Sequence, residues 1–158
     1  MDISIIFPNQ IFEKSKLLDE STKIYLIEEY LFFNQFKFHK QKILFHRMTM
    51  KSYERFLQKN SFDIEYIDST EKFSDIRSFI ENIDSNINSI KIYDPVDNWL
   101  SKRIIDTCKL KNINVEVYDN PLFINKDEDL SSFFRSDKKK FFQTSFYKQQ
   151  RLKLDMMM

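Results

Sequence analysis

The feature that most constrains this fold is the alternation of short β-branched runs with longer segments of helical periodicity. The runs are strand candidates, at residues 3–7, 23–29, 62–68, 89–94 and 114–119. Between them, apolar residues recur at spacings of three and four, which predicts helices near 40–58, 75–84 and 98–111. Ser74 and either Asp97 or Asn98 are the expected N-caps of the last two.

Such alternation is typical of right-handed βαβ units, which build parallel sheets. We therefore predict an α/β fold: a doubly wound, five-stranded parallel sheet in the order 3-2-1-4-5, with helices on both faces. A chain of 158 residues is long enough for one such domain with a sizeable core.

Composition excludes several classes of site. The chain contains no glycine, so neither a GxGxxG loop nor a P-loop can be present. Its one cysteine, Cys108, lies among apolar residues of a predicted helix and is expected to be a buried structural thiol. His39 and His46 are seven residues apart, too far to share a metal ion without other ligands. We expect no metal site and assign no catalytic residue.

Charge and hydropathy point to a water-soluble protein without naming a partner. The formal net charge is only +1. Apolar runs fall far short of the roughly 20 residues that span a bilayer, and the N-terminus lacks the basic start of a signal peptide. We expect a cytoplasmic protein that does not bind membranes.

Ligands of open α/β sheets bind beyond the carboxyl ends of the strands, where the strand order reverses. In the predicted order this point lies between the first and fourth strands. The loops expected at this edge are Pro8 to Gln10, Glu28 to Tyr30, Pro95 to Trp99 and Asn120 to Phe123. Glu28 and Glu29 could accept hydrogen bonds from a ligand or act as a general base, or they could be solvated turn residues.

An aromatic and basic stretch, residues 31–43, follows the second predicted strand. Its phenylalanines, Phe32, Phe33, Phe36 and Phe38, could cover the sheet as core or as an interface. They could also form a stacking wall for a planar ligand, with Lys40 or Lys42 meeting an anionic or carbonyl group. The two interpretations are compatible.

The segment after residue 130 changes character, because basic residues are interleaved with aromatic ones over 131–158. We divide the chain into an α/β domain, 1–130, and this basic aromatic segment. Such a pattern can grip nucleic acid through phosphate contacts and base stacking. The alternative is a segment that packs on a part of the protein outside this chain, since so many aromatic residues need burial.

Four segments carry a family resemblance: FPNQIF at 7–12, IEEYLFFNQFKFHKQKILFHRMTMKSYERFL at 27–57, YDNPLFI at 118–124, and FFQTSFYKQQRLKLDMMM at 141–158. In this order they resemble the N-terminal region of the cryptochrome/photolyase family. The branch is that of deoxyribodipyrimidine photolyase-related proteins, or iron–sulfur bacterial cryptochromes and photolyases.

The resemblance implies a Rossmann-like antenna domain. Complete members carry a larger helical domain that binds FAD and a four-iron cluster, and they act in light-dependent DNA repair or in blue-light sensing. The expected partners are therefore that helical domain and, in the complete protein only, DNA. The present chain alone is not expected to be catalytic.

The resemblance also implies an antenna chromophore, 6,7-dimethyl-8-ribityllumazine or a flavin-like molecule. The positions that match the family's strand-end motifs, with their neighbours, are Asn9, Gln10, Glu28, Glu29, Tyr30, His39 and Lys40. Gln10 and Glu28 would hydrogen-bond the polar ring edge or the ribityl hydroxyls, and Lys40 would meet a carbonyl. A competing hypothesis is a free-standing α/β nucleotide-binding or partner-docking module with a basic tail.

Overall fold

The structure is a computed structural model that describes residues 1–156, with the side chain of Asp127 left out. The chain divides into two compact units, Met1–Asn120 and Pro121–Met158, which are described separately. The domain boundary after residue 130 that the composition suggests remains a prediction.

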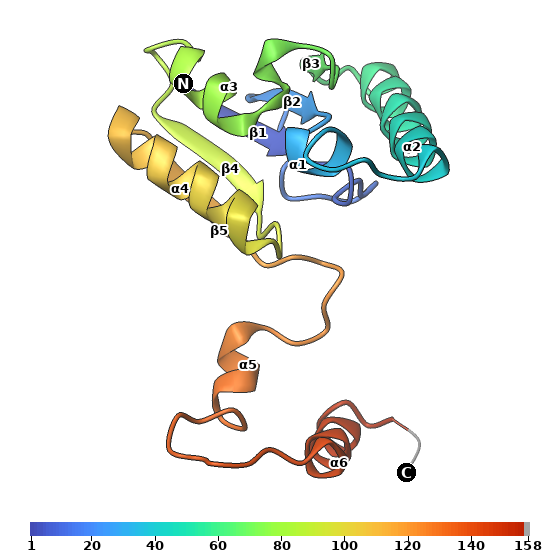
Figure 1. Ribbon diagram of the computed structural model, residues 1–158, viewed down its shortest axis with the longest axis vertical. Helices are drawn as coiled ribbons and strands as arrows, with labels where there is room; N and C mark the ends of the chain where they lie inside the picture. The colour runs from blue at the N-terminus through green and yellow to red at the C-terminus, as the bar shows by residue number, and fades with distance from the viewer. Residues whose placement is uncertain (157–158) are drawn as a thin grey trace. The chain divides into compact units, whose positions relative to one another are not determined.

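The first unit is built on a five-stranded parallel sheet (Figure 1). Its strands are β1 (Asp2–Ile6), β2 (Lys23–Ile27), β3 (Ile64–Ile67), β4 (Ser89–Tyr93) and β5 (Asn114–Tyr118). They are ordered β3-β2-β1-β4-β5, and every neighbouring pair is parallel. The predicted α/β fold and strand order are confirmed, and β1 and β4 meet where the order reverses.

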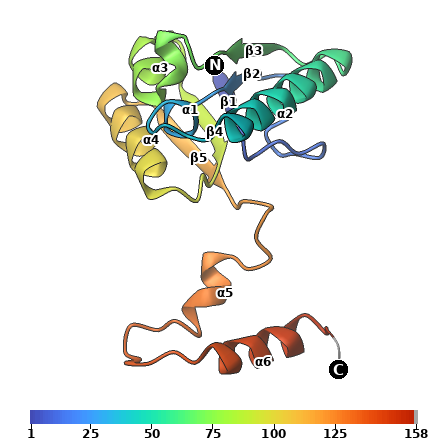
Figure 2. The same cartoon turned by 45° about the vertical axis from the view of Figure 1, so that its right-hand side comes forward.

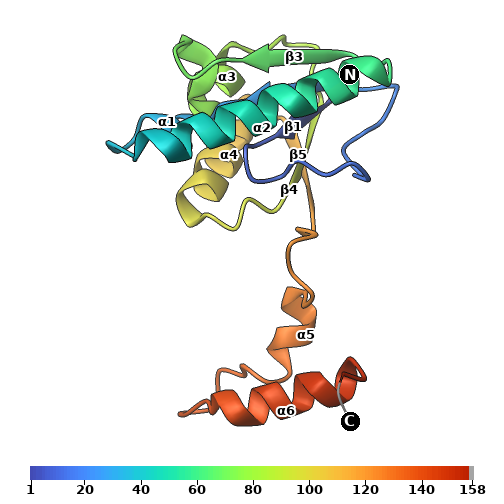
Figure 3. The ribbon, with the colours of Figure 1, turned by 90° about the vertical axis from the view of Figure 1, so that its right-hand side faces the viewer.

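Helices cover both faces of the sheet because strand side chains alternate between them. Helices α3 (Ile76–Asn82) and α4 (Asn98–Lys111) pack on the face that carries Ile3, Ile5 and Ile90. Helix α2 (Lys40–Lys59) packs on the opposite face through Met50, Tyr53 and Leu57. Figures 2 and 3 show α2 lying over the sheet, with α3 and α4 on the other side.

The helices begin at side chains that cap them. The carboxylates of Asp75 and Asp97 accept hydrogen bonds at 2.9 Å from the backbone N–H groups of Arg77 and Leu100, at the starts of α3 and α4. Of the two N-caps predicted for α4, Asp97 and Asn98, the structure confirms Asp97. The prediction for α3 is wrong, because Asp75 and not Ser74 is its N-cap. A carboxylate attracts the positive end of the helix more strongly than a hydroxyl does.

A chain without glycine must place other residues in the left-handed region of the backbone. Asn112 ends α4 at φ 56°, a conformation that asparagine tolerates. Val96, between β4 and α4, has φ 57°. A β-branched residue rarely adopts this geometry, so the loop after β4 is strained.

Cys108 is fully buried on α4, as predicted, and burial raises the pKa of its thiol to about 11. None of the helices within residues 1–156 has both the length and the apolar character that crossing a membrane requires.

Up to residue 156, the second unit contains two helices, α5 (Asp127–Ser131) and α6 (Gln143–Lys153). Phe133, Phe134, Phe141 and Phe146 pack against one another, with ring centroids 5.0–6.4 Å apart. These four aromatic side chains thus contact each other, but Phe134 and Phe141 are still exposed, as are Phe142 and Tyr147. Nucleic-acid binding by this unit remains a prediction.

Candidate functional site

The carboxyl ends of the strands meet at one edge of the sheet, because all five strands are parallel. Strand β1 ends at Ile6, β2 at Ile27, β4 at Tyr93 and β5 at Tyr118. The four loops expected at this edge therefore begin there.

Gln10 links the loop after β1 to the end of β4, at the place where the strand order reverses. Its side chain is fully buried, and Nε2 donates to the carbonyl oxygens of Tyr93 at 3.3 Å and Asp94 at 3.0 Å. The Asp94 carbonyl also accepts a hydrogen bond from Asn120 Nδ2 at 2.8 Å. One amide side chain from the loop after β1 and one from the loop after β5 thus tie both loops to the end of β4.

Two acceptor oxygens at this point are unsatisfied. Gln10 Oε1 and Asn9 Oδ1 are buried and have no hydrogen-bond partner among the described residues. Buried polar atoms in proteins nearly always have a partner, so an unsatisfied pair requires an explanation. The strained residue Val96 lies in the loop that directly follows β4, at the same edge.

Glu28, at the end of β2, is fully buried in a polar cluster that we call the Glu28 cluster: Glu28, Arg47, Tyr66, Asp68 and Ser69. Arg47 donates from Nε to Glu28 Oε1 at 2.8 Å and from Nη2 to Glu28 Oε2. The Tyr66 hydroxyl donates to Oε1 at 2.5 Å, and the Ser69 N–H donates to Oε2 at 2.9 Å. Both carboxylate oxygens are therefore fully used inside the protein.

The charges in this cluster stabilise one another. Burial by itself would raise the pKa of Glu28, but the bonds from Arg47, Tyr66 and Ser69 outweigh it and lower the pKa. The bond to Glu28 raises the pKa of Arg47, so that the guanidinium stays charged. Arg47 Nη2 also contacts Asp68 Oδ1 at 3.1 Å and donates to Ser69 Oγ at 2.8 Å.

Glu29 lies in a different environment. It is fully buried, and its two oxygens accept hydrogen bonds from the backbone N–H groups of Leu31 and Ile76, at the starts of α1 (Tyr30–Phe33) and α3. Burial raises the pKa of this carboxyl to about 7; the two backbone bonds lower it, the charge of Asp75 adds to the rise, and Arg103 opposes it. Glu29 therefore joins two helix starts while changing its charge near neutral pH.

The remaining predicted site residues have other immediate roles. Tyr30 is the half-buried first residue of α1. His39 Nδ1 caps α2 by accepting a hydrogen bond from the Gln41 N–H at 3.2 Å, and Lys40 is the exposed first residue of that helix. In the part of the chain that the structure describes, no hydrogen bond joins these three to Gln10 or Glu28.

The phenylalanines of residues 31–43 were expected either to cover the sheet as core or to form a stacking wall for a ligand, and their burial differs. Phe33 is buried in the core beneath α2, and Phe32 and Phe38 are half-buried. Phe36 is 57% exposed, and the Lys42 ammonium lies 4.0 Å from the centre of the Phe38 ring. Phe33 therefore serves the core, while a stacking role for Phe36 or Phe38 remains a prediction.

Sequence reasoning missed the residues that surround Glu28. Arg47, Tyr66 and Ser69 come from α2, from β3 and from the loop after β3. One signal was available: Arg47 lies one turn before the buried Met50, next to the apolar face of its helix, where an arginine needs a buried partner. Nothing in the sequence identified Glu28 as that partner.

No group of three or more metal-binding side chains forms within the described residues. His46 is half-buried next to Phe33 and Phe45, and burial, followed by the charge of Lys42, lowers its pKa.

Comparison with known proteins places the chain in a family. The family model described as deoxyribodipyrimidine photo-lyase-related protein matches residues 4–158. The uncharacterized protein R852 of Acanthamoeba polyphaga mimivirus is 34% identical over 167 aligned residues, covering 99% of this chain and 85% of that protein. Both matches run over nearly the whole chain, across the sheet and the second unit alike. The chain belongs to the deoxyribodipyrimidine photo-lyase-related protein family.

Proposed function

We propose that this chain binds an antenna-type chromophore, a ribityllumazine or a flavin-like molecule, at the carboxyl edge of its sheet. It would serve as the chromophore-binding part of a photolyase-related system for light-dependent DNA repair or blue-light sensing. Family membership and the doubly wound fold support the proposal.

The observation that carries the proposal is the pair of unsatisfied oxygens on Asn9 and Gln10. They lie at the reversal point between β1 and β4, where sheets of this class bind ligands. A lumazine or flavin ring has an imide N–H, which is the donor that an amide oxygen lacks here. Lys40, on the exposed start of α2, is the candidate to meet a ring carbonyl.

The bonds within the Glu28 cluster remove Glu28 from the residues proposed to contact the ligand directly. Because all its bonds are made within the protein, Glu28 acts in this proposal by holding Arg47 and the loop after β3. Direct ligand contacts are assigned to Asn9, Gln10 and Lys40. Glu29, Tyr30 and His39 act by setting the path of the chain between β2 and α2.

The four-iron cluster of the family does not fit this chain alone. A four-iron cluster is held by four cysteines, and the sequence has one, which is buried. The cluster would therefore belong to a separate helical domain together with the catalytic FAD, whereas a flavin bound at the carboxyl edge of this chain would act only as an antenna. A bound antenna chromophore supplies light absorption, and without an acceptor flavin the chain would only absorb and re-emit.

The test uses Trp99, which is the one tryptophan in the sequence and lies 56% exposed in the first turn of α4. We expect ribityllumazine or FAD to quench its fluorescence saturably. Gln10→Met should weaken binding roughly 10-fold, the effect of losing about one good hydrogen bond. Asn9→Ala and Lys40→Ala should weaken it less.

The matched control is Lys59→Ala, an exposed lysine at the other end of α2, which should leave binding unchanged. Circular dichroism establishes that each variant is folded. Absence of saturable binding of either chromophore to the folded chain would contradict the proposal.

A further inference from the structure

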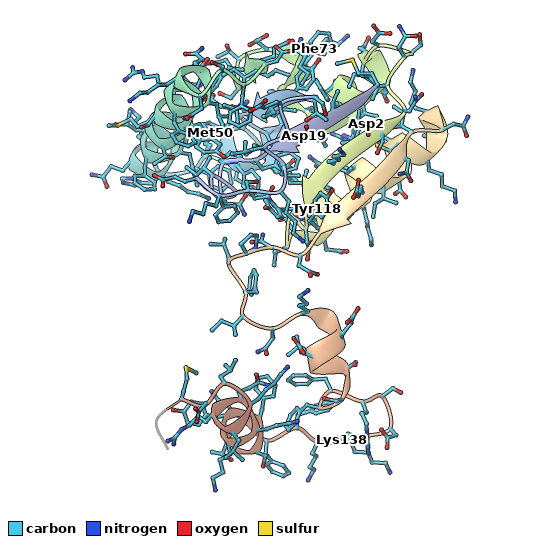
Figure 4. All side chains as sticks on the ribbon, turned by 180° about the vertical axis from the view of Figure 1, so that it is seen from behind. Asp2, Asp19, Met50, Phe73, Tyr118 and Lys138 are labelled. Carbon is cyan, nitrogen blue, oxygen red and sulfur yellow. The ribbon has the colours of Figure 1, made fainter. Side chains whose placement is uncertain are left out.

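A small cavity lies on the sheet face that α3 covers. It has a volume of about 160 Å³ and is lined by Tyr25, Phe73, Phe79, Glu65, Asp84 and Asn82, among others. Tyr25 and Glu65 are cross-strand partners on β2 and β3. Phe73 belongs to the short 3-10 helix η1 (Lys72–Ser74), and Phe79 belongs to α3. Figure 4 labels Phe73, near the top of the view.

Three aromatic rings line this cavity. The rings of Tyr25 and Phe79 lie 4.8 Å apart between centroids and are inclined by 66°, so that their faces point in different directions. Phe73 is 40% exposed and completes the wall. Aromatic faces carry partial negative charge, and walls of this kind attract cations, above all methylated ammonium groups.

The charged side chains that line the cavity also favour a cation. Glu65 and Asp84 are both acidic, and no lysine, arginine or histidine is among the lining residues. Nearby, the ammonium of Lys23 pairs with Glu65 at 2.6 Å and lies 5.1 Å from the centre of the Tyr25 ring. The protein's own lysine thus already makes both contacts, aromatic and acidic, that an incoming cation would make.

The volume of the cavity and the chemistry of its lining limit which ligands it can bind. Pockets for cofactors and drug-sized ligands measure about 300–1,000 Å³, so 160 Å³ suits a headgroup rather than a lumazine or a nucleotide. Calcium prefers six to eight oxygen ligands, which two carboxylates and one amide among aromatic rings do not supply. We propose that this cavity binds a small quaternary or methylated ammonium group. The proposal is independent of the chromophore site.

The experiment compares choline with 3,3-dimethylbutan-1-ol, which has the same shape without the charge. The complete chain is titrated with each compound by calorimetry and by NMR. We expect saturable binding of choline and at least roughly 10-fold weaker binding of the alcohol, because only a cation gains from the ring faces and the carboxylates.

Variants locate the binding. Phe73→Ala and Asp84→Asn should each weaken choline binding several-fold, and both sites are at the surface, so the fold should survive. Lys23→Met should tighten binding, because it removes the competing ammonium and frees Glu65. Phe45→Ala, at an exposed ring on α2, is the matched control and should have no effect.

Three results would overturn the proposal: no binding of choline to the folded chain, equal binding of choline and the alcohol, or binding that Phe73→Ala and Asp84→Asn leave unchanged. A weaker affinity in Lys23→Met would also contradict it, since that lysine would then assist the ligand rather than compete with it.

Discussion

Glu28 and Glu29 are consecutive residues, yet the structure gives them opposite environments. Glu28 points to the α2 side of the sheet, where Arg47, Tyr66 and Ser69 satisfy its charge. Glu29 points to the α3 side, where backbone N–H groups are its only hydrogen-bond donors among the described residues. The pKa of Glu28 is lowered and that of Glu29 is raised to about 7.

The difference shows that burial alone does not decide the charge of a carboxyl group. Both side chains are fully buried, and burial by itself would raise both pKa values. A bidentate guanidinium on one side reverses the outcome. Glu28 therefore stabilises the fold above its unfolded pKa, and this contribution is lost as the pH falls through the lower folded value.

The largest expected effect is that of Glu28→Ala. The Arg47 side chain is 37% exposed and keeps Asp68 as a partner, so removing Glu28 should cost about 2–3 kcal/mol of unfolding free energy, below the usual range for a fully buried pair. Urea denaturation measures the change. Glu65→Ala, which breaks an exposed pair with Lys23, should cost less than about 1 kcal/mol. Equal costs for the two variants would show that the Glu28 cluster is not a stabilising unit.

The second prediction concerns Glu29→Gln and its dependence on pH. The folded pKa of Glu29, about 7, lies above the ordinary value of 4.5. Between these values the folded chain holds a proton that the unfolded chain has lost, so stability falls as the pH rises from about 4.5 to about 7. Glutamine lacks the charge but has one acceptor oxygen where the carboxylate uses two.

We therefore expect the sign of the effect to change with pH. At pH 8 the variant should be more stable than the wild type by about 2 kcal/mol, and at pH 4, below the unfolded pKa, less stable by about 1 kcal/mol, from the lost hydrogen bond. Urea titrations at the two pH values provide the measurement. A variant that is destabilised equally at both would mean that folding does not shift the pKa of Glu29.

The smallest expected effect is a change in the pKa of Glu29 when its charged neighbours are replaced. Asp75→Asn keeps a capping side chain for α3 but removes a negative charge that raises this pKa. The pKa should fall by less than about one unit, as followed by NMR titration of the Glu29 carboxyl carbon. Arg103→Met should raise it. Asp68→Asn, in the Glu28 cluster, is the control and should leave it unchanged.

The predicted strands and helices agree with the structure to within a few residues, because each depends on local periodicity. The N-cap of α3 was misassigned by one residue, since Ser74 and Asp75 are both good capping types and the sequence does not say which one precedes the first turn. The short helix α1 and the capping role of His39 carried no periodic signal.

The candidate site was predictable only in part. The strand-end rule placed Asn9, Gln10, Glu28 and Glu29 at the carboxyl edge of the sheet, where the structure has them, because parallel strands end together. It did not separate the satisfied carboxylate of Glu28 from the unsatisfied amide of Gln10. That distinction depends on Arg47 and Tyr66, which lie 19 and 38 residues away from Glu28 along the chain.

The sequence by itself determined the class of fold, the strand order and the family, because alternating apolar periods and ordered motifs are properties of the chain read in one dimension. Only the tertiary structure decided which acid is paired, which is protonated near neutral pH and which amide oxygens lack a partner. It also brought three aromatic rings and two acids together around one cavity. These properties are set by distances between side chains that are remote in sequence, and such distances exist only once the chain is folded.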